Sequence, residues 1–166
     1  MRTFSIVQYP HPMLRKVASP VTAFDQRIAS VVRRMIATMY RNKGLGLAAP
    51  QVNLSDRILV FDVSDERDQA CVLINPEILG SEGSRLSEEG CLSVPDVRVS
   101  VPRADQVVIR GRDETGKALK LNAGGLMSVV LQHEIDHLNG ILIVDYLPAG
   151  TSLEMVREKQ SRLAAR

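Results

Sequence analysis

The chain has 166 residues, of which 45% are hydrophobic and 24% are charged, and its formal net charge is +2. This length suits one domain with a core of its own, so we expect a single catalytic domain over residues 1–166. No apolar stretch approaches the roughly 18 residues of a membrane span, and so small a net charge gives no argument for DNA binding. The amino terminus lacks the pattern of a secretory signal, so we expect a cytoplasmic protein without a membrane partner.

The chain up to residue 121 predicts one helix followed by a sheet. Apolar residues recur at three- and four-residue steps between Asp25 and Asn42, the pattern of a helix with one buried face, and we expect Gly44 to end it in the left-handed conformation. Short β-branched runs then predict strands at 57–63, 71–75, 97–101, 107–112 and 118–121. The connections are too short for crossover helices, which favours antiparallel pairing and an α+β fold.

The last third of the chain predicts two more helices. One begins near Gly125 and ends at Asn139 and Gly140, and an apolar run at 141–147 predicts a short strand after it. Thr151 and Glu154 then have the spacing of a capping box, which predicts a C-terminal helix. We therefore expect antiparallel sheets packed around the middle helix, with one helix towards each end of the chain.

The middle helix contains the clearest chemical signal. Two of the three histidines in the chain, His133 and His137, stand four residues apart, so both rings can reach one cation from the same helix face. Glu134 lies one step round the helix, where it suits a group that accepts a proton from the attacking water. The alternative is an ordinary amphipathic helix with chance polar residues. The sequence therefore favours a metal-binding helix at the centre of the fold.

A catalytic metal site normally has three protein ligands and one open position, so a third ligand must come from elsewhere. Cys91 is the best candidate, because it follows a glycine that lets the backbone approach closely. Cys71 stands in an apolar run and is interpreted as a core residue, and His11, between two prolines, as a surface or packing residue. A structural site with four ligands is the alternative, and it would require Cys71 to bind as well.

Three segments together resemble the peptide deformylases: Gly44–Gln51 (GLGLAAPQ), Glu89–Ser93 (EGCLS) and Gln132–His137 (QHEIDH). Their order and separation match that family over nearly the whole chain, in the form found in bacteria. The resemblance implies an enzyme that removes the formyl group from the starting methionine of nascent proteins and gives formate. A zinc endopeptidase is the rival interpretation, because the same helix motif serves that class, although its third ligand is usually His or Glu.

The resemblance also implies roles for residues around the metal. The side-chain amide of Gln51 and the backbone N–H of Leu92 would stabilise the developing oxyanion. Main-chain groups of Gly46 and Gly90 would pair with the substrate backbone. The methionine pocket would be formed by Leu45, Leu126, Val129 and Val130, with Arg98 at its edge and Ser87 on its rim. On sequence grounds Leu126, Val129 and Val130 are equally well interpreted as ordinary core residues.

The cofactor and further partners follow partly from chemistry and partly from the resemblance. One thiolate and two imidazoles suit iron(II), zinc, nickel or cobalt, and the resemblance points to Fe2+ with the others able to substitute. Glu88 or Glu89 could pair with Arg103 to support the cysteine loop, and a solvated surface pair is the alternative. The resemblance suggests that the last helix touches the ribosome, although a plain solvated face is the alternative. Its basic residues are Arg157, Lys159, Arg162 and Arg166.

Overall fold

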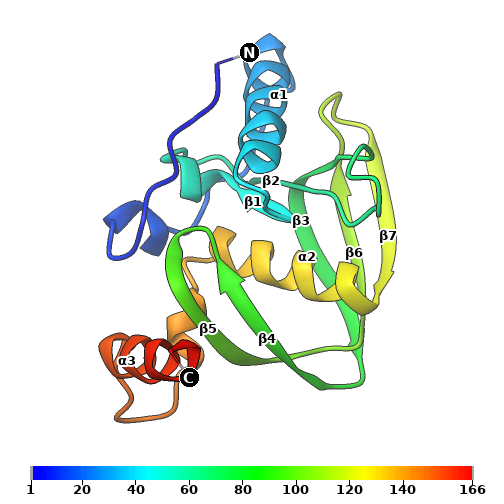
Figure 1. The fold of residues 1–166 in the computed structure, drawn as a ribbon. Helices are drawn as coiled ribbons and strands as arrows, with labels where there is room; N and C mark the ends of the chain where they lie inside the picture. The colour runs from blue at the N-terminus through cyan, green and yellow to red at the C-terminus, as the bar shows by residue number, and fades with distance from the viewer. Residues whose placement is uncertain (1, 166) are drawn as a thin grey trace.

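The computed structural model describes residues 2–165, and it confirms the α+β fold (Figure 1). The three α-helices in this part of the chain are α1 (Gln26–Arg41), α2 (Gly125–Leu138) and α3 (Leu153–Ala164). The strands are β1 (Gly46–Ala48), β2 (Ile58–Phe61), β3 (Cys71–Glu82), β4 (Arg85–Cys91), β5 (Val94–Arg103), β6 (Gln106–Arg112) and β7 (Ala118–Gly124). They form a five-stranded sheet in the order β1-β2-β3-β6-β7 and a separate β4–β5 hairpin, and every pairing is antiparallel.

The large sheet is covered by helices on both faces at β1 and β2. Figure 1 shows α1 on one side of these strands and α2 on the other. Strand β2 is apolar at every position because its alternate side chains serve two cores: Ile58 and Val60 pack with α1, whereas Leu59 and Phe61 pack with α2. The two helices are therefore fixed to the same strands, with α2 in the middle of the molecule.

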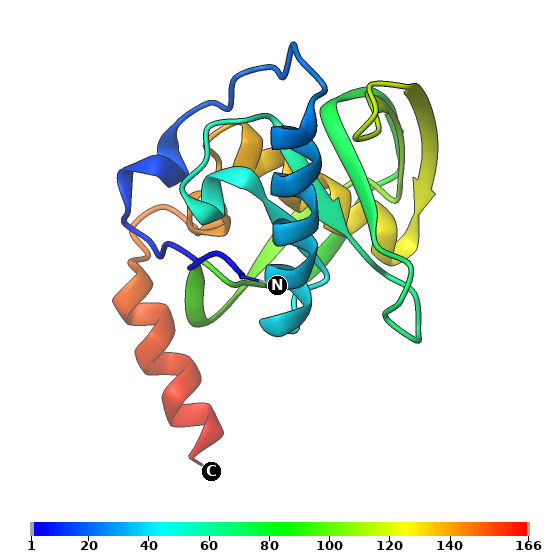
Figure 2. The ribbon, with the colours of Figure 1, turned by 90° about the horizontal axis from the view of Figure 1, so that it is seen from above.

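The β4–β5 hairpin lies on the opposite side of α2 from the large sheet (Figure 1). Alternate valines of β5, including Val97 and Val99, are buried in a third cluster that also contains Leu153 of α3. From there α3 projects away from the sheets, as Figure 2 shows from above. No helix among residues 2–165 is both long and apolar enough to cross a membrane.

Two expectations for the helix ends are corrected by the structure. Lys43, not Gly44, takes the left-handed conformation after α1, with φ 56°. At Gly44 a Cβ would lie 2.8 Å from Leu92 Cδ1, so a larger residue there would displace the Leu92 side chain. At α3, Ser152 rather than Thr151 is the N-cap, since its hydroxyl oxygen accepts a hydrogen bond from the backbone N–H of Met155.

Two expectations from apolar runs are also wrong. Residues 141–147 do not form a strand: Ile143–Tyr146 is a 3₁₀ helix, and the Asp145 carboxylate accepts the backbone N–H of Leu142 at 2.9 Å to open this turn. Cys71 is in a strand, as expected, but it is exposed at the first position of β3 and is not a core residue.

Candidate metal centre and substrate groove

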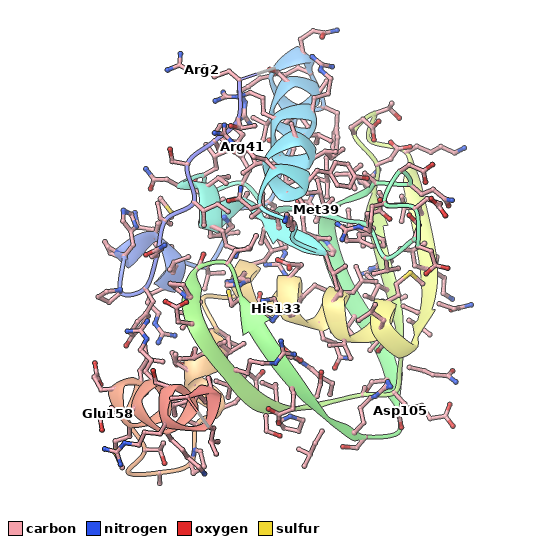
Figure 3. All side chains as sticks on the ribbon, viewed as in Figure 1. Arg2, Met39, Arg41, Asp105, His133 and Glu158 are labelled. Atoms are coloured by element: carbon pink, nitrogen blue, oxygen red, sulfur yellow. The ribbon has the colours of Figure 1, made fainter. Side chains whose placement is uncertain are left out.

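The three predicted metal ligands lie together in the structure. His133 and His137 project from successive turns of α2, and Cys91 ends β4 in the hairpin above them. One ligand atom from each residue lies within 4.8 Å of the other two, and Cys91 Sγ is 3.3 Å from His137 Nε2. His133 is labelled in Figure 3 on the part of α2 that faces the hairpin. Cys71 has no part in this cluster, which argues against a closed site with four ligands.

A buried ion network holds the hairpin against α2. Arg103 at the end of β5 donates two hydrogen bonds to Glu89, at 2.7 and 2.9 Å, and a third to Asp136 of α2 at 2.6 Å. Tyr146 also donates to Asp136, at 2.7 Å. The sequence left open whether Glu88 or Glu89 pairs with Arg103, and in the structure the partner is Glu89. Both ligand-bearing elements, the hairpin and α2, are joined through one guanidinium.

Glu89 also orients a ligand directly. Its second oxygen lies 2.9 Å from His133 Nδ1, which leaves Nε2 of that ring for a cation. Burial would raise the pKa of Glu89, but the hydrogen bonds from Arg103 and His133 outweigh burial and hold the pKa at about 2. The carboxylate is thus charged at neutral pH and fixes the orientation of the imidazole.

Glu134 is placed beside the ligands in a tight pocket. Its side chain is 4% exposed, and a Cβ at position 46 would lie 2.5 Å from Glu134 Oε1, so only glycine fits there. Glu134 Oε2 is buried without a hydrogen-bond partner among the described residues, as expected for an atom that faces a water or ligand. Burial raises the pKa of this carboxyl to about 7, although the nearby His133 acts in the opposite direction.

Gln51 is oriented by its own turn. The residues Ala49–Val52 form a 3₁₀ turn in which Gln51 Oε1 accepts the backbone N–H of Ala48 at 2.9 Å. This bond turns the amide nitrogen towards the site, where it lies 3.2 Å from Ser93 Oγ and 3.8 Å from Cys91 Sγ. The side chain is 2% exposed, so the structure presents a fixed donor beside the ligands.

A groove with a volume of about 610 Å³ opens over this centre. All the pocket residues suggested by the resemblance line it, including Leu126, Val129 and Val130, which the sequence could equally assign to the core. Leu126 is 52% exposed, whereas Val130 is also buried against the large sheet. The predicted residues on the wall are Leu45, Gly46, Ser87, Gly90, Leu92, Arg98, Leu126, Val129 and Val130.

The groove also contains residues that the sequence did not indicate. Lys43, Asp96 and Gln160 line it, and Gln160 comes from α3, a helix with no other predicted link to the site. Asp96 has a left-handed backbone, with φ 65°, in a tight part of the hairpin. No spacing rule connects these three residues to the metal ligands.

One thiol and two imidazoles beside a buried carboxylate form the arrangement of a metallohydrolase with a single metal ion. Residues 3–152 match the family described as polypeptide deformylase. The chain belongs to this family. It is a metal-dependent hydrolase that removes the N-terminal formyl group from the formyl-methionine of nascent proteins and releases formate.

Solved peptide deformylases have the same fold. The structure from Legionella pneumophila is 40% identical, with a TM-score of 0.88, and covers 99% of each chain. The structure from Synechococcus elongatus in complex with actinonin is 37% identical, with a TM-score of 0.88, and covers 95% of this chain and 88% of that one. The structure from Thermotoga maritima is 40% identical, with a TM-score of 0.85, and covers 89% of this chain and 99% of that one.

Proposed function

We propose that Cys91, His133 and His137 bind one divalent cation and that Glu134 is the proton carrier of deformylation. The observation that carries this proposal is that the three ligand atoms lie within 4.8 Å of one another, next to the buried Glu134 Oε2, which has no hydrogen-bond partner among residues 2–165. Burial, together with the nearby His133, lowers the pKa of His137 well below the usual value.

The cation that we propose is Fe2+, with Zn2+, Ni2+ or Co2+ able to occupy the same ligands. One thiolate and two imidazoles accept all four, so the donor set supports this group of metals without choosing among them. When bound, such a dication supplies positive charge that polarises the formyl carbonyl and acidifies water.

Glu134 would accept a proton from the attacking water at Oε2 and later pass it to the amine that leaves. A base works best when its pKa is near the working pH, and the pKa of about 7 at this carboxyl supports the role. The tight contact with Gly46 keeps the carboxylate from turning away. A cation held by the ligands would favour the ionised form of Glu134 and so its action as a base.

Gln51 and Leu92 would stabilise the negative oxygen that develops on the formyl group. The amide of Gln51 is already turned towards Cys91 by its bond to Ala48, so no reorganisation is needed during the reaction. The backbone N–H of Leu92 would be the second donor, at the turn of the hairpin that follows Cys91.

The substrate would lie in the groove as an extended peptide between two backbone edges. We assign pairing with the peptide backbone to main-chain groups of Gly46 and Gly90, one on each wall. The methionine side chain would enter the apolar part of the groove formed by Leu45, Leu126, Val129 and Val130. Arg98 would lie at its edge, and Ser87 would make this rim more polar than an apolar residue would.

We further propose that residues 1–166 act as one catalytic domain in the cytoplasm and that α3 contacts the ribosome. The exposed basic residues Arg157, Lys159 and Arg162 support an RNA contact, and Arg166, which belongs to the same prediction, lies outside the described residues. The partial pairing of Arg162 with Glu158, at 3.7 Å, leaves most of this charge free for a partner.

The decisive experiment joins metal analysis with a substrate comparison. Protein purified without oxygen should contain about one Fe2+ per chain. It should release formate from a formyl-methionyl tripeptide, and it should not cleave unformylated peptides at internal bonds. Cleavage of internal bonds would instead indicate an endopeptidase.

A matched pair of cysteine variants tests the ligand assignment. Cys91→Ala should weaken binding of the cation by more than about 100-fold, since loss of even an outer partner of a ligand costs 10- to 100-fold. Cys71→Ala, which removes the exposed thiol of β3, should retain the metal content of the unmodified protein. Loss of metal from the Cys71 variant would indicate a closed site with four ligands.

A further inference from the structure

Gln160 of α3 makes an unusual contact with strand β5. Its side-chain amide bonds both main-chain groups of one residue: Oε1 accepts the N–H of Arg98 at 3.0 Å, and Nε2 donates to the Arg98 carbonyl at 2.7 Å. Strand β5 pairs with β4 along its other edge, so this edge would otherwise present unpaired backbone groups. Gln160 thus acts at this point as a neighbouring strand would.

The contact continues from the backbone of Arg98 to the wall of the groove. The guanidinium of Arg98 crosses to β4, where Nη2 donates to the Glu88 carbonyl at 2.5 Å. Its Nη1 also lies 4.0 Å from where a Cβ on Gly90 would be. Both Arg98 and Gln160 line the groove. A continuous series of contacts therefore runs from α3 to the edge of β4 that, in our proposal, pairs with the substrate.

The side chain of Arg98 needs such support because burial does not hold it. Arg98 is exposed, whereas its neighbours Val97 and Val99 are buried. A long exposed side chain has many rotamers, and ordering it costs free energy. Fixing the backbone of Arg98 from α3 reduces the number of positions that its guanidinium can take.

We propose that Gln160 is a positioning residue for the substrate: it makes the C-terminal helix part of the peptide-binding wall, acting through Arg98. This inference depends on the proposed groove. The hydrogen bonds of the Gln160 side chain go to Arg98 and not to Cys91, His133 or His137, so it serves the binding of the peptide and not the chemical step. Its loss therefore raises KM and leaves kcat unchanged.

The test compares Gln160→Met with Ser161→Met. Methionine has nearly the shape of glutamine without its donor and acceptor, and Ser161 is the adjacent exposed residue. With a formyl-methionyl tripeptide and the metal-loaded full chain, Gln160→Met should raise KM by roughly three- to tenfold with kcat within about twofold. Ser161→Met should change neither parameter.

Amide hydrogen exchange supplies an independent readout. The backbone N–H of Arg98 should exchange faster in Gln160→Met than in the unmodified protein or in Ser161→Met, because its acceptor is lost. Unchanged exchange would show that the contact does not form in solution, and faster exchange with an unchanged KM would show that it does not reach the substrate. Either result overturns the proposal. Failure of the proposed function is distinguishable, because the unmodified protein would then release no formate.

Discussion

Two arginines of the same strand hold the two sides of the groove in different ways. Arg103 is 4% exposed and bonds the carboxylates of Glu89 and Asp136 beneath the metal ligands. Arg98, five residues earlier, is exposed, and it bonds the carbonyl oxygen of Glu88 and the side-chain amide of Gln160 around the rim. The metal side is thus fixed by ion pairs that are buried away from water. On the peptide side, water can replace the hydrogen bonds of the exposed Arg98.

This difference predicts that substitutions on the metal side abolish turnover or stability, whereas those at the rim change substrate affinity. The effect should be largest at the proton carrier Glu134, smaller on loss of the buried Arg103, and smaller again at Asp62, which bonds the opposite wall of the groove.

Glu134→Gln should give the largest loss. Glutamine keeps the shape that fits against Gly46 but cannot carry the proton, so kcat should fall by about 100- to 10,000-fold while the metal content stays the same. Formate release and metal analysis of the same sample measure both quantities. Glu154→Gln, on the exposed first turn of α3, is the matched control and should retain full turnover. A variant of Glu134 with substantial turnover would assign the proton to another group.

Arg103→Met should be the next most damaging change. It leaves the carboxylates of Glu89 and Asp136 without their shared cation, and breaking such a buried pair costs about 3–5 kcal/mol of unfolding free energy. Metal affinity should also fall by about 10- to 100-fold, because Glu89 no longer holds His133 firmly. Urea unfolding and metal competition measure the two effects.

Arg85→Met is the control for that change. Arg85 is an exposed arginine of β4 whose partner Asp105 is 3.6 Å away, so its loss should cost less than about 1 kcal/mol. If Arg103→Met were as stable as Arg85→Met, burial of the charged group would not explain why the metal side is held more firmly than the rim.

The parts of the fold that depend on local periodicity were predictable from the sequence. Helix α2 and the meeting of His133 with His137 follow from helix geometry, because four residues make about one turn. Cys91 was chosen as the third ligand because a glycine precedes it and Cys71 stands in an apolar run, and the resemblance agreed with that choice. Its contact with His137 joins residues 46 positions apart.

The parts that depend on distant contacts were not predictable. Strand β4 (RLSEEGC) has few apolar residues, and it is a strand because it pairs with β5 and because Glu89 finds Arg103 in the interior. Residues 141–147 are apolar enough for a strand, but the side chain of Asp145 bonds the backbone of Leu142 and bends the chain. Gln160 meets Arg98 across 62 positions, which no sequence spacing indicates.

The wall of the groove that contains Leu45 lies next to a buried carboxylate, that of Asp62, just as the metal side lies next to Glu89. Asp62 is 1% exposed, and its backbone N–H donates to the Leu45 carbonyl at 2.9 Å. Its carboxylate accepts hydrogen bonds from Ser64, Tyr40 and Gln69. Burial alone would raise the pKa of Asp62, but these hydrogen bonds outweigh burial and lower the pKa to about 2.

These hydrogen bonds predict that stability depends on pH through Asp62, with a smaller effect than the loss of Arg103. The folded pKa of about 2 lies below the unfolded value of about 3.9, so the ionised group stabilises the fold above pH 4 and this contribution is lost as the pH falls towards 2. Asp62→Asn lacks the contribution at every pH. In urea unfolding the variant should be less stable than the unmodified protein at pH 7, and the gap should narrow between pH 4 and pH 2. Because all other carboxylates titrate in both proteins, the difference isolates Asp62. If the difference in unfolding free energy stayed constant with pH, the hydrogen bonds of Asp62 would not depend on its charge. This wall would then not be held by a buried charge as the metal side is.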